Sequence, residues 1–221
     1  MHPDDLPGVL AFLRAAERLK STTRTGYTST GQQESVAEHT WRLCLMALVL
    51  RPAFPEIDFA KLVKICIIHD LGEAVHGDVP APEQARRAAA GATAGKATQE
   101  RRDLLELLMP LPAMVRDEIT ALWDEYEAAQ SLEAKLAKGL DKLETIMQHN
   151  QGLNPADFDY RFNLGYGRQH TADIPVIAQL RAMLDEETGA KQRRRIGAKI
   201  GRQISVRLVI LADLDLCPSQ K

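Results

Sequence analysis

The sequence predicts an all-α protein, and three observations support that fold class. Leu and Ala are abundant and recur at three- and four-residue steps along most of the 221-residue chain, which places them on one face of a helix. Aromatic residues make up only 5% of the chain, and runs of β-branched residues, which favour strands, are short. A chain of this length can bury a full hydrophobic core. We therefore expect a bundle of about seven or eight helices.

The N-terminal part contains three predicted helices, at residues 4–20, 35–50 and 59–73. In each of them apolar residues repeat with the helical period. The second helix is ended by the prolines at Pro52 and Pro55, which cannot continue it. The first helix is expected to turn four apolar side chains inward: Leu10, Phe12, Leu13 and Leu19.

Beyond Pro80 the chain is first rich in small residues and then helical again. Residues 83–100 contain few large apolar side chains, so we expect a partly helical, mobile connection there. Further helices are predicted at residues 99–109, 113–128, 131–149 and 174–187, followed by a final segment at residues 191–212 that is basic at its start.

Four polar side chains lie on or beside these apolar faces, where they are costly unless something satisfies them. His39 falls on the stripe of the second helix, His69-Asp70 follows a largely apolar run, and Asp141 edges the stripe of its helix. Two imidazoles and two carboxylates suit a divalent cation. Taken singly, His39 is better explained as a core histidine bonded to the backbone and Asp141 as a solvated charge. Together the four residues predict a metal site.

Longer motifs around these residues resemble one known family, the HD-domain metal-dependent phosphohydrolases, and within it the 5'-deoxynucleotidase branch. The resemblance rests on five segments, at residues 19–27, 34–39, 69–74, 77–80 and 140–144. It covers roughly residues 6–186 and implies an HD-domain helical bundle over residues 1–187. Residues 188–221 are then a basic helical extension, and the protein is expected to be a homodimer.

The same resemblance bears on the number of metal ions. Dinuclear members of the superfamily use extra histidines between the His-Asp pair and the last Asp. Only His76 lies between Asp70 and Asp141 in this chain. We therefore expect one divalent ion per chain, drawn from Mn, Co, Zn, Fe, Ni and Mg.

Two further acidic residues are predicted to act in catalysis. Glu73 follows His69 by four residues and Asp70 by three, which on a helix places it one turn further along the same side. Asp78 follows Gly77 in a predicted turn. The resemblance implies that Glu73 and Asp78 are catalytic. The alternatives are that Glu73 is a helix-end charge and that Asp78 caps a turn.

Arg24 and Tyr27 are the predicted substrate-binding residues. A guanidinium suits a phosphate through paired donors, and an aromatic ring can pack against a sugar or a base. The family more usually has Trp where this chain has Tyr27. The alternative for Arg24 is an exposed, solvated side chain.

These expectations combine into an enzyme that removes the 5'-phosphate from deoxyribonucleoside monophosphates by attack of a metal-activated water. One alternative is an HD-type phosphohydrolase of another nucleotide or small phosphomonoester. A second, of a different class, is a nucleic-acid-binding module that uses the basic C-terminal residues Lys191, Arg193, Arg194, Arg195, Lys199, Arg202 and Arg207. No aromatic residues interleave with these charges and the net charge is −2, so nucleic acid is not the expected partner.

The sequence also bears on the compartment. No run approaches eighteen apolar residues, and the N-terminus lacks a basic segment followed by an apolar one, so neither a membrane span nor a signal peptide is expected. The cysteines Cys44, Cys66 and Cys217 are far apart and form no Cys-x-x-Cys pair, which favours a reducing compartment. We therefore expect a cytoplasmic protein.

Overall fold

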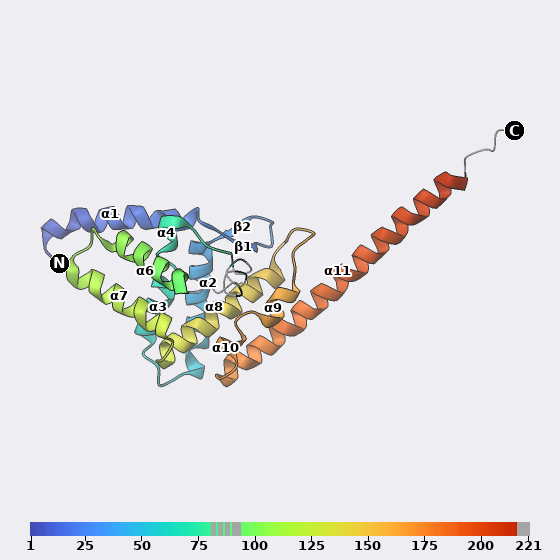
Figure 1. Cartoon of the computed structure of the whole chain (residues 1–221). Helices are drawn as coiled ribbons and strands as arrows, with labels where there is room; N and C mark the ends of the chain where they lie inside the picture. The colour runs from blue at the N-terminus through green and yellow to red at the C-terminus, as the bar shows by residue number, and fades with distance from the viewer. Residues whose placement is uncertain (81–82, 84–85, 87–88, 90–93, 216–221) are drawn as a thin grey trace.

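The computed structural model describes residues 1–80, 83, 86, 89 and 94–215. The all-α prediction is confirmed, because the described elements are helices apart from one small two-stranded sheet (Figure 1). The α-helices are α1 (Leu6–Ala16), α2 (Val36–Leu50), α3 (Phe59–Ile68), α4 (Glu73–His76), α6 (Ala94–Leu108), α7 (Ala113–Ala128), α8 (Leu132–Gln151), α9 (Arg161–Gly165), α10 (Arg168–Thr171) and α11 (Pro175–Asp215). Shorter elements are the 3₁₀ helices η1 (Pro3–Asp5), η2 (Glu17–Lys20) and η3 (Arg51–Ala53), and the strands β1 (Thr23–Tyr27) and β2 (Gln33–Ser35).

Helix α8 is the central element of the bundle (Figure 1). It contacts α2, α3, α7, α10 and α11, and most of its side chains are buried. Leu136, Leu140 and Leu143 recur along it with the predicted helical spacing and share one core cluster with Leu62 and Ile65 of α3. Each fully buried side chain of this kind stabilises the fold by about 1.5–3 kcal/mol. The helix that carries Asp141 is therefore held firmly on several sides.

A second apolar cluster joins α1, η2, α4, α6 and α7. Phe12 and Leu19 face this cluster as predicted. Leu10 and Leu13 do not, since they are 47% and 57% exposed, and their predicted inward orientation was wrong. Helix α1 touches the bundle through the stripe of Val9 and Phe12, three residues apart, which turns the adjacent positions outward.

The predicted helix at residues 59–73 is interrupted. Helix α3 ends at Ile68, and α4 begins only at Glu73. Between them the chain makes the tighter 3₁₀ type of bond, from Glu73 N–H to the Asp70 carbonyl at 3.0 Å. A Cβ at Gly72 would lie 2.9 Å from the Glu100 carbonyl of α6, so this turn is pressed against a neighbouring helix. With three residues per turn, Asp70 and Glu73 still lie on the same side.

A β-hairpin was not predicted from the sequence. Strands β1 and β2 pair antiparallel, with Thr23 opposite Ser35 and Tyr27 opposite Gln33. The connecting turn contains Gly31 at φ +89°, a left-handed conformation that glycine adopts without steric cost. The hairpin brings β1, which belongs to the segment at residues 19–27, against α8 (Figure 1).

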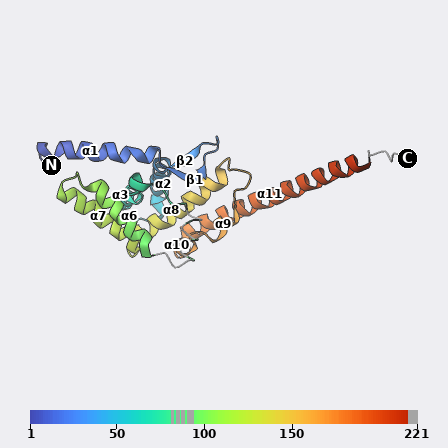
Figure 2. The ribbon, with the colours of Figure 1, turned by 45° about the horizontal axis from the view of Figure 1, so that its top comes forward.

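Helix α11 is one continuous helix, whereas the sequence indicated two segments. It runs through the expected domain boundary at residue 187 and leaves the bundle toward the C-terminus (Figures 1 and 2). The division into residues 1–187 and 188–221 stays a prediction. The side chains of Lys199, Arg202 and Arg207 lie outside the described residues. The connection predicted at residues 83–100 also falls largely outside them, although α6 already begins at Ala94.

None of the described helices combines the length and the apolar content needed to cross a bilayer.

Gly152 determines how closely the hairpin approaches α8. It lies at the C-terminal end of α8, and a Cβ at this position would lie 2.2 Å from the Tyr27 carbonyl oxygen. Gln148 donates a hydrogen bond to the same oxygen at 2.5 Å. The N–H of Leu153 donates to the carbonyl of Thr28 at 3.0 Å. The position of β1 therefore depends on the absence of a side chain at Gly152.

We predict that Gly152→Ala lowers the free energy of unfolding by about 1–3 kcal/mol, the usual range for overpacking a close contact. The matched control is Gly165→Ala, whose new Cβ meets no described atom within 4 Å. Urea denaturation followed by circular dichroism measures both. Equal stability of the two variants would show that the hairpin moves aside at no cost.

Candidate metal centre

His39 enters the core from the first turn of α2. A capping box begins this helix, because Ser35 Oγ accepts the Glu38 N–H while the Glu38 carboxylate accepts the Ser35 N–H. The next residue, His39, is fully buried. Its Nε2 lies 3.4 Å from Asp141 Oδ1 and 3.9 Å from Asp70 Oδ2. Within the described part of the chain this nitrogen has no hydrogen-bond partner.

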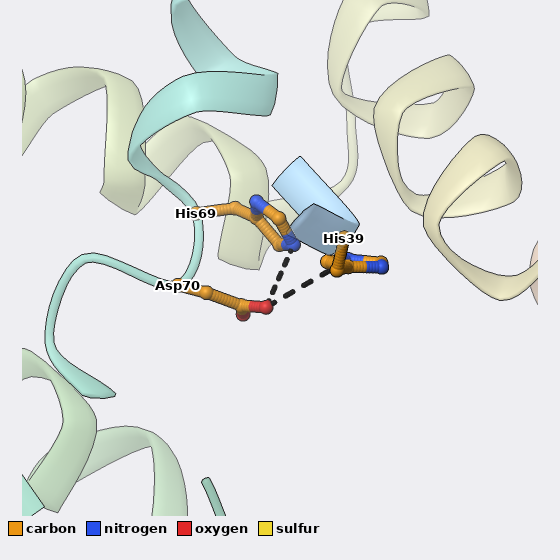
Figure 3. Close-up of side chains that lie close together, drawn as sticks. All are labelled: His39, His69 and Asp70. Atoms are coloured by element: carbon orange, nitrogen blue, oxygen red, sulfur yellow. Dashed lines mark ion pairs between the residues drawn. The ribbon is translucent and has the colours of Figure 1, made fainter. Parts of the chain in front are cut away.

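His69 reaches the same point from the end of α3 (Figure 3). Its Nδ1 bonds to the carbonyl of Cys66 at 2.9 Å, and its Nε2 faces Asp70 Oδ2 at 3.0 Å. Nε2 makes no hydrogen bond to any described atom, so it is a second buried nitrogen in need of a partner. The ligand atoms of His39, His69 and Asp70 all lie within 4.8 Å of one another.

The two imidazoles fit a metal ion. Nδ1 of His39 bonds to the Glu144 carboxylate and Nδ1 of His69 to a backbone carbonyl, so in the neutral rings the lone pair is on Nε2. Outer hydrogen bonds of this kind orient metal-binding histidines. Both lone pairs face carboxylate oxygens of Asp70 and Asp141. This donor set suits a divalent cation.

Asp141 is fixed by neighbours on two sides. Its Oδ2 accepts hydrogen bonds from Tyr126 at 3.0 Å and from Lys142 Nζ at 2.7 Å, which leaves Oδ1 toward His39. Burial alone would raise the pKa of Asp141, but Lys142 and the two histidines lower it well below its usual range. The carboxylate is therefore an anion, and it lies beside the compact group of His39, His69 and Asp70.

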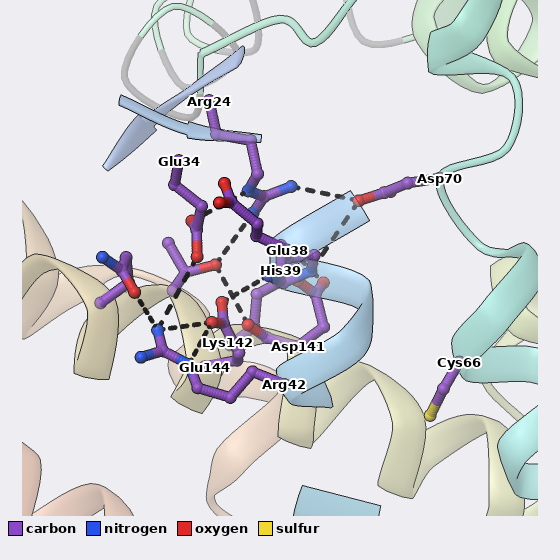
Figure 4. Close-up of polar contacts among 12 residues, drawn as sticks. Arg24, Glu34, Glu38, His39, Arg42, Cys66, Asp70, Asp141, Lys142 and Glu144 are labelled. Atoms are coloured by element: carbon purple, nitrogen blue, oxygen red, sulfur yellow. Dashed lines mark hydrogen bonds and ion pairs between the residues drawn. The ribbon is translucent and has the colours of Figure 1, made fainter. Parts of the chain in front are cut away.

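Glu144 and Arg42 belong to the site although the sequence did not identify them (Figure 4). Glu144 is fully buried, and its carboxylate binds His39 Nδ1 and accepts from Arg42 Nε at 2.7 Å. Burial would raise the pKa of Glu144, but His39 and Arg42 lower it. One signal was available: Glu144 follows Asp141 by three residues and so shares its side of α8.

Arg24 points into the site from β1 (Figure 4). Its Nη1 donates to Asp70 Oδ2 at 3.1 Å and its Nη2 to Thr145 Oγ1 at 3.1 Å. Its Nε lies 3.7 Å from Glu34, and only 11% of the side chain is exposed. Burial alone would lower the pKa of Arg24, but Asp70 and other nearby carboxylates raise it. The alternative of a solvated, exposed Arg24 does not hold.

Glu73 and Asp78 line the same pocket as Asp70. Burial, together with repulsion from Asp70 and Asp78, raises the pKa of Glu73 to about 10. Its Oε2 is buried without a hydrogen-bond partner in the described structure. A nearby cation favours the anionic form of such a carboxyl group, and a positioned carboxyl group can then exchange protons with a reactant.

The pocket gathers most of the predicted site residues but not Tyr27. Its walls include Arg24, His69, Asp70, Glu73, Asp78 and Asp141, together with Lys142 and Thr145. His39 lies in the core beside this pocket. Tyr27 stands three positions after Arg24 on β1, and the register of the hairpin shifts between Thr23 and Tyr27, so strict alternation does not set the orientation of its side chain. Tyr27 lines a neighbouring hollow.

The chain is similar to known proteins along most of its length. A family model described as HD domain matches residues 16–181. The 5'-deoxynucleotidase HDDC2 of Mus musculus is 32% identical over 152 residues, which cover 65% of this chain and 69% of that protein. The corresponding protein of Bos taurus is 33% identical over 145 residues, covering 65% and 67%. The 5'-deoxynucleotidase hdd1 of Schizosaccharomyces pombe is 32% identical over 143 residues, covering 63% and 70%.

Solved structures show the same fold. A predicted metal-dependent phosphohydrolase from Magnetospirillum magnetotacticum MS-1 superposes with a TM-score of 0.69 at 24% identity, covering 86% of this chain and 96% of that one. A conserved hypothetical protein from Pyrococcus furiosus superposes with a TM-score of 0.53 at 30% identity, covering 80% and 98%. The residues matched by the family model include His39, the His69-Asp70 pair and Asp141. The chain therefore belongs to the HD-domain family of hydrolases.

Proposed function

We propose that this protein removes the 5'-phosphate from deoxyribonucleoside monophosphates. The observation that carries the proposal is the meeting of two buried imidazole nitrogens, unpartnered among the described atoms, with the carboxylates of Asp70 and Asp141. The substrate class is supported by relatives that are 5'-deoxynucleotidases. Homodimer formation and a cytoplasmic location stay predictions.

The proposed ligands are His39, His69, Asp70 and Asp141, around one divalent cation. Hydrolysis of phosphomonoesters is among the slowest uncatalysed reactions, and a bound divalent cation supplies a water of lowered pKa and neutralises phosphoryl oxygens. The two histidines contribute neutral nitrogen donors, and the two aspartates contribute negative charge. Burial of the ligands protects this arrangement from competing water.

Two proton transfers accompany the hydrolysis. As the P–O5' bond breaks, the attacking water gives up one proton and the departing 5'-oxygen takes one up. Four acidic residues of the pocket wall are not proposed as ligands: Glu73, Asp78, Glu100 and Glu127. We assign Glu73 to the proton of the attacking water and Asp78 to the leaving group. The resemblance implies that both residues are catalytic, and the shared pocket supports this; the division of the two proton transfers between them is part of the proposal.

Arg24 and Lys142 supply positive charge for the phosphate. Both line the pocket, and they donate to Asp70 and Asp141 respectively. Each cation has N–H groups beyond the one bonded to its carboxylate partner, and these can donate to phosphate oxygens. The guanidinium of Arg24 has the planar fork that matches a phosphate with two parallel donors.

We expect His69→Ala and Asp70→Ala to lose both the bound metal and phosphate release, because each removes a proposed ligand. Elemental analysis of the purified proteins and a phosphate-release assay measure the two losses. The control is His76→Ala, which removes an exposed imidazole of the same segment that pairs with Asp103 at 2.9 Å. A full equivalent of metal in either ligand variant contradicts the assignment.

Glu73→Gln separates chemistry from metal binding. This variant is expected to keep the metal and to lose about 10²–10⁴-fold in kcat, the usual contribution of a positioned acid or base. Steady-state kinetics together with metal content test it, and Glu106→Gln on the exposed side of α6 serves as the matched control. A kcat near that of the parent removes Glu73 from the mechanism.

Arg24→Ala is expected to lower kcat/KM about ten- to hundredfold, since it removes a charge-assisted contact worth about 1.5–3 kcal/mol. Arg24→Lys should recover only part of this loss, because an ammonium restores the charge without the planar fork. Kinetics with a deoxyribonucleoside monophosphate measure both variants, and metal content is expected to stay unchanged. Unaltered kcat/KM in Arg24→Ala would make Arg24 only a structural partner of Asp70 and leave the substrate class open.

A further inference from the structure

A second hollow, of about 370 Å³, lies beside the metal pocket. Its walls are largely aromatic, with side chains from β1 (Tyr27), from α8 (His149) and from the segment around α9 (Phe158 and Phe162). We call it the aromatic hollow. Its volume is within the range of small-molecule sites in proteins. The proposed phosphate chemistry uses none of the residues Phe158, Phe162 and His149.

Three features connect the aromatic hollow with the metal pocket. Thr25 lines both of them. The ring of Phe162, in the hollow, lies 5.2 Å from the ring of Tyr166, in the metal pocket. On α8 the residues Asp141, Thr145 and His149 follow one another at four-residue steps, so one face of this helix borders both spaces.

The distance between the metal pocket and the aromatic hollow suits a mononucleotide. Eight residues separate Asp141, at the metal pocket, from His149, at the hollow, which corresponds to about 12 Å along the helix axis. A phosphate bound at one end therefore leaves its sugar and base directed along α8 toward the other.

The chemistry of the aromatic hollow excludes the phosphate end of such a ligand. Burial lowers the pKa of His149, so its ring is neutral at pH 7, and its Nδ1 bonds to Asn163 at 2.8 Å. The carboxylate of Asp157 lies at the hollow and repels a phosphate. Flat aromatic walls instead suit a planar heteroaromatic ring, which stacks on them.

The Phe158 ring is held in place for such stacking. It lies 4.8 Å from the ring of His149 and 5.0 Å from that of Tyr160, in both cases edge to face. The carboxylate of Asp159 is engaged by Arg161 at 2.9 and 3.1 Å. Asp157 therefore remains as the acceptor that can meet an exocyclic amino group of a base.

We propose that the aromatic hollow binds the base of the deoxyribonucleoside monophosphate whose phosphate lies at Arg24 and the metal centre. The inference rests on the proposed function and adds the location of the base. Tyr27, Phe158 and Phe162 contribute binding energy through the base alone. Their removal must then affect a nucleotide but not a sugar phosphate that lacks a base.

The test compares two substrates, deoxyadenosine 5'-monophosphate and 2-deoxyribose 5-phosphate. In Phe158→Leu and Phe162→Leu, KM for the nucleotide is expected to rise about 5- to 150-fold, the change that corresponds to the about 1–3 kcal/mol of one base–aromatic stack. Phe158→Tyr keeps an aromatic ring and should keep the parent KM. The kinetics of 2-deoxyribose 5-phosphate should be unchanged in every variant, which also shows that the metal centre is intact.

Trp41→Leu is the matched control, because it removes an exposed aromatic ring of α2 that lines neither space. An unchanged nucleotide KM in both Leu variants, or an equal loss with both substrates, overturns this inference and leaves the proposed function in place.

A parent protein that hydrolyses neither substrate overturns the proposed function itself. In that case, titration of the metal-free protein with deoxyadenosine, followed by NMR, still tests the hollow: shifts of the Phe158 and Phe162 signals support binding of a base, and unchanged signals exclude it.

Discussion

The contact between His39 of α2 and Glu144 of α8 is the interaction on which the site depends. It joins residues 105 positions apart, both of them fully buried. It determines which nitrogen of His39 faces the pocket, and Arg42 completes it by pairing with the same carboxylate. Removing one partner of such a buried pair generally costs about 3–5 kcal/mol, because an uncompensated charge is left inside. The contact of His39 and Arg42 with Glu144 thus fixes both the packing of α2 on α8 and the orientation of the proposed ligand His39.

Acidic groups outnumber basic ones in this region. The charged side chains discussed above are six carboxylates, from Glu34, Asp70, Glu73, Asp78, Asp141 and Glu144, and three cations, from Arg24, Arg42 and Lys142, so full ionisation of this set leaves an excess of three negative charges. Burial and neighbouring carboxylates accordingly raise the pKa of Glu34 to about 7 and that of Glu73 to about 10. A divalent cation offsets most of this negative excess. The excess therefore favours metal binding, and the bound cation in turn favours the ionised form of Glu73.

The sequence predicted the features that are set by the residues of a single helix. Apolar spacing predicted the main helices, and polar residues within those stripes predicted side chains that the fold brings together at one pocket. Features that depend on distant contacts were missed. The hairpin depends on pairing across a turn and on packing against Gly152. The short helices α9 and α10 have too few residues to show a helical period. The 3₁₀ turn reflects the contact of Gly72 with α6. Glu144 was missed because its partner lies on another helix.

The 3₁₀ turn between Asp70 and Glu73 has a consequence for how the chain can vary in length. At three residues per turn, one inserted or deleted residue swings every later side chain by about 120°, which carries Glu73 away from the pocket while leaving Asp70 in it. The tip of the β-hairpin, around Thr30 and Gly31, is exposed and lies beyond the paired residues. Insertions there lengthen a surface loop without rotating Arg24. The two segments that flank the same pocket therefore differ sharply in the sequence changes they can accommodate.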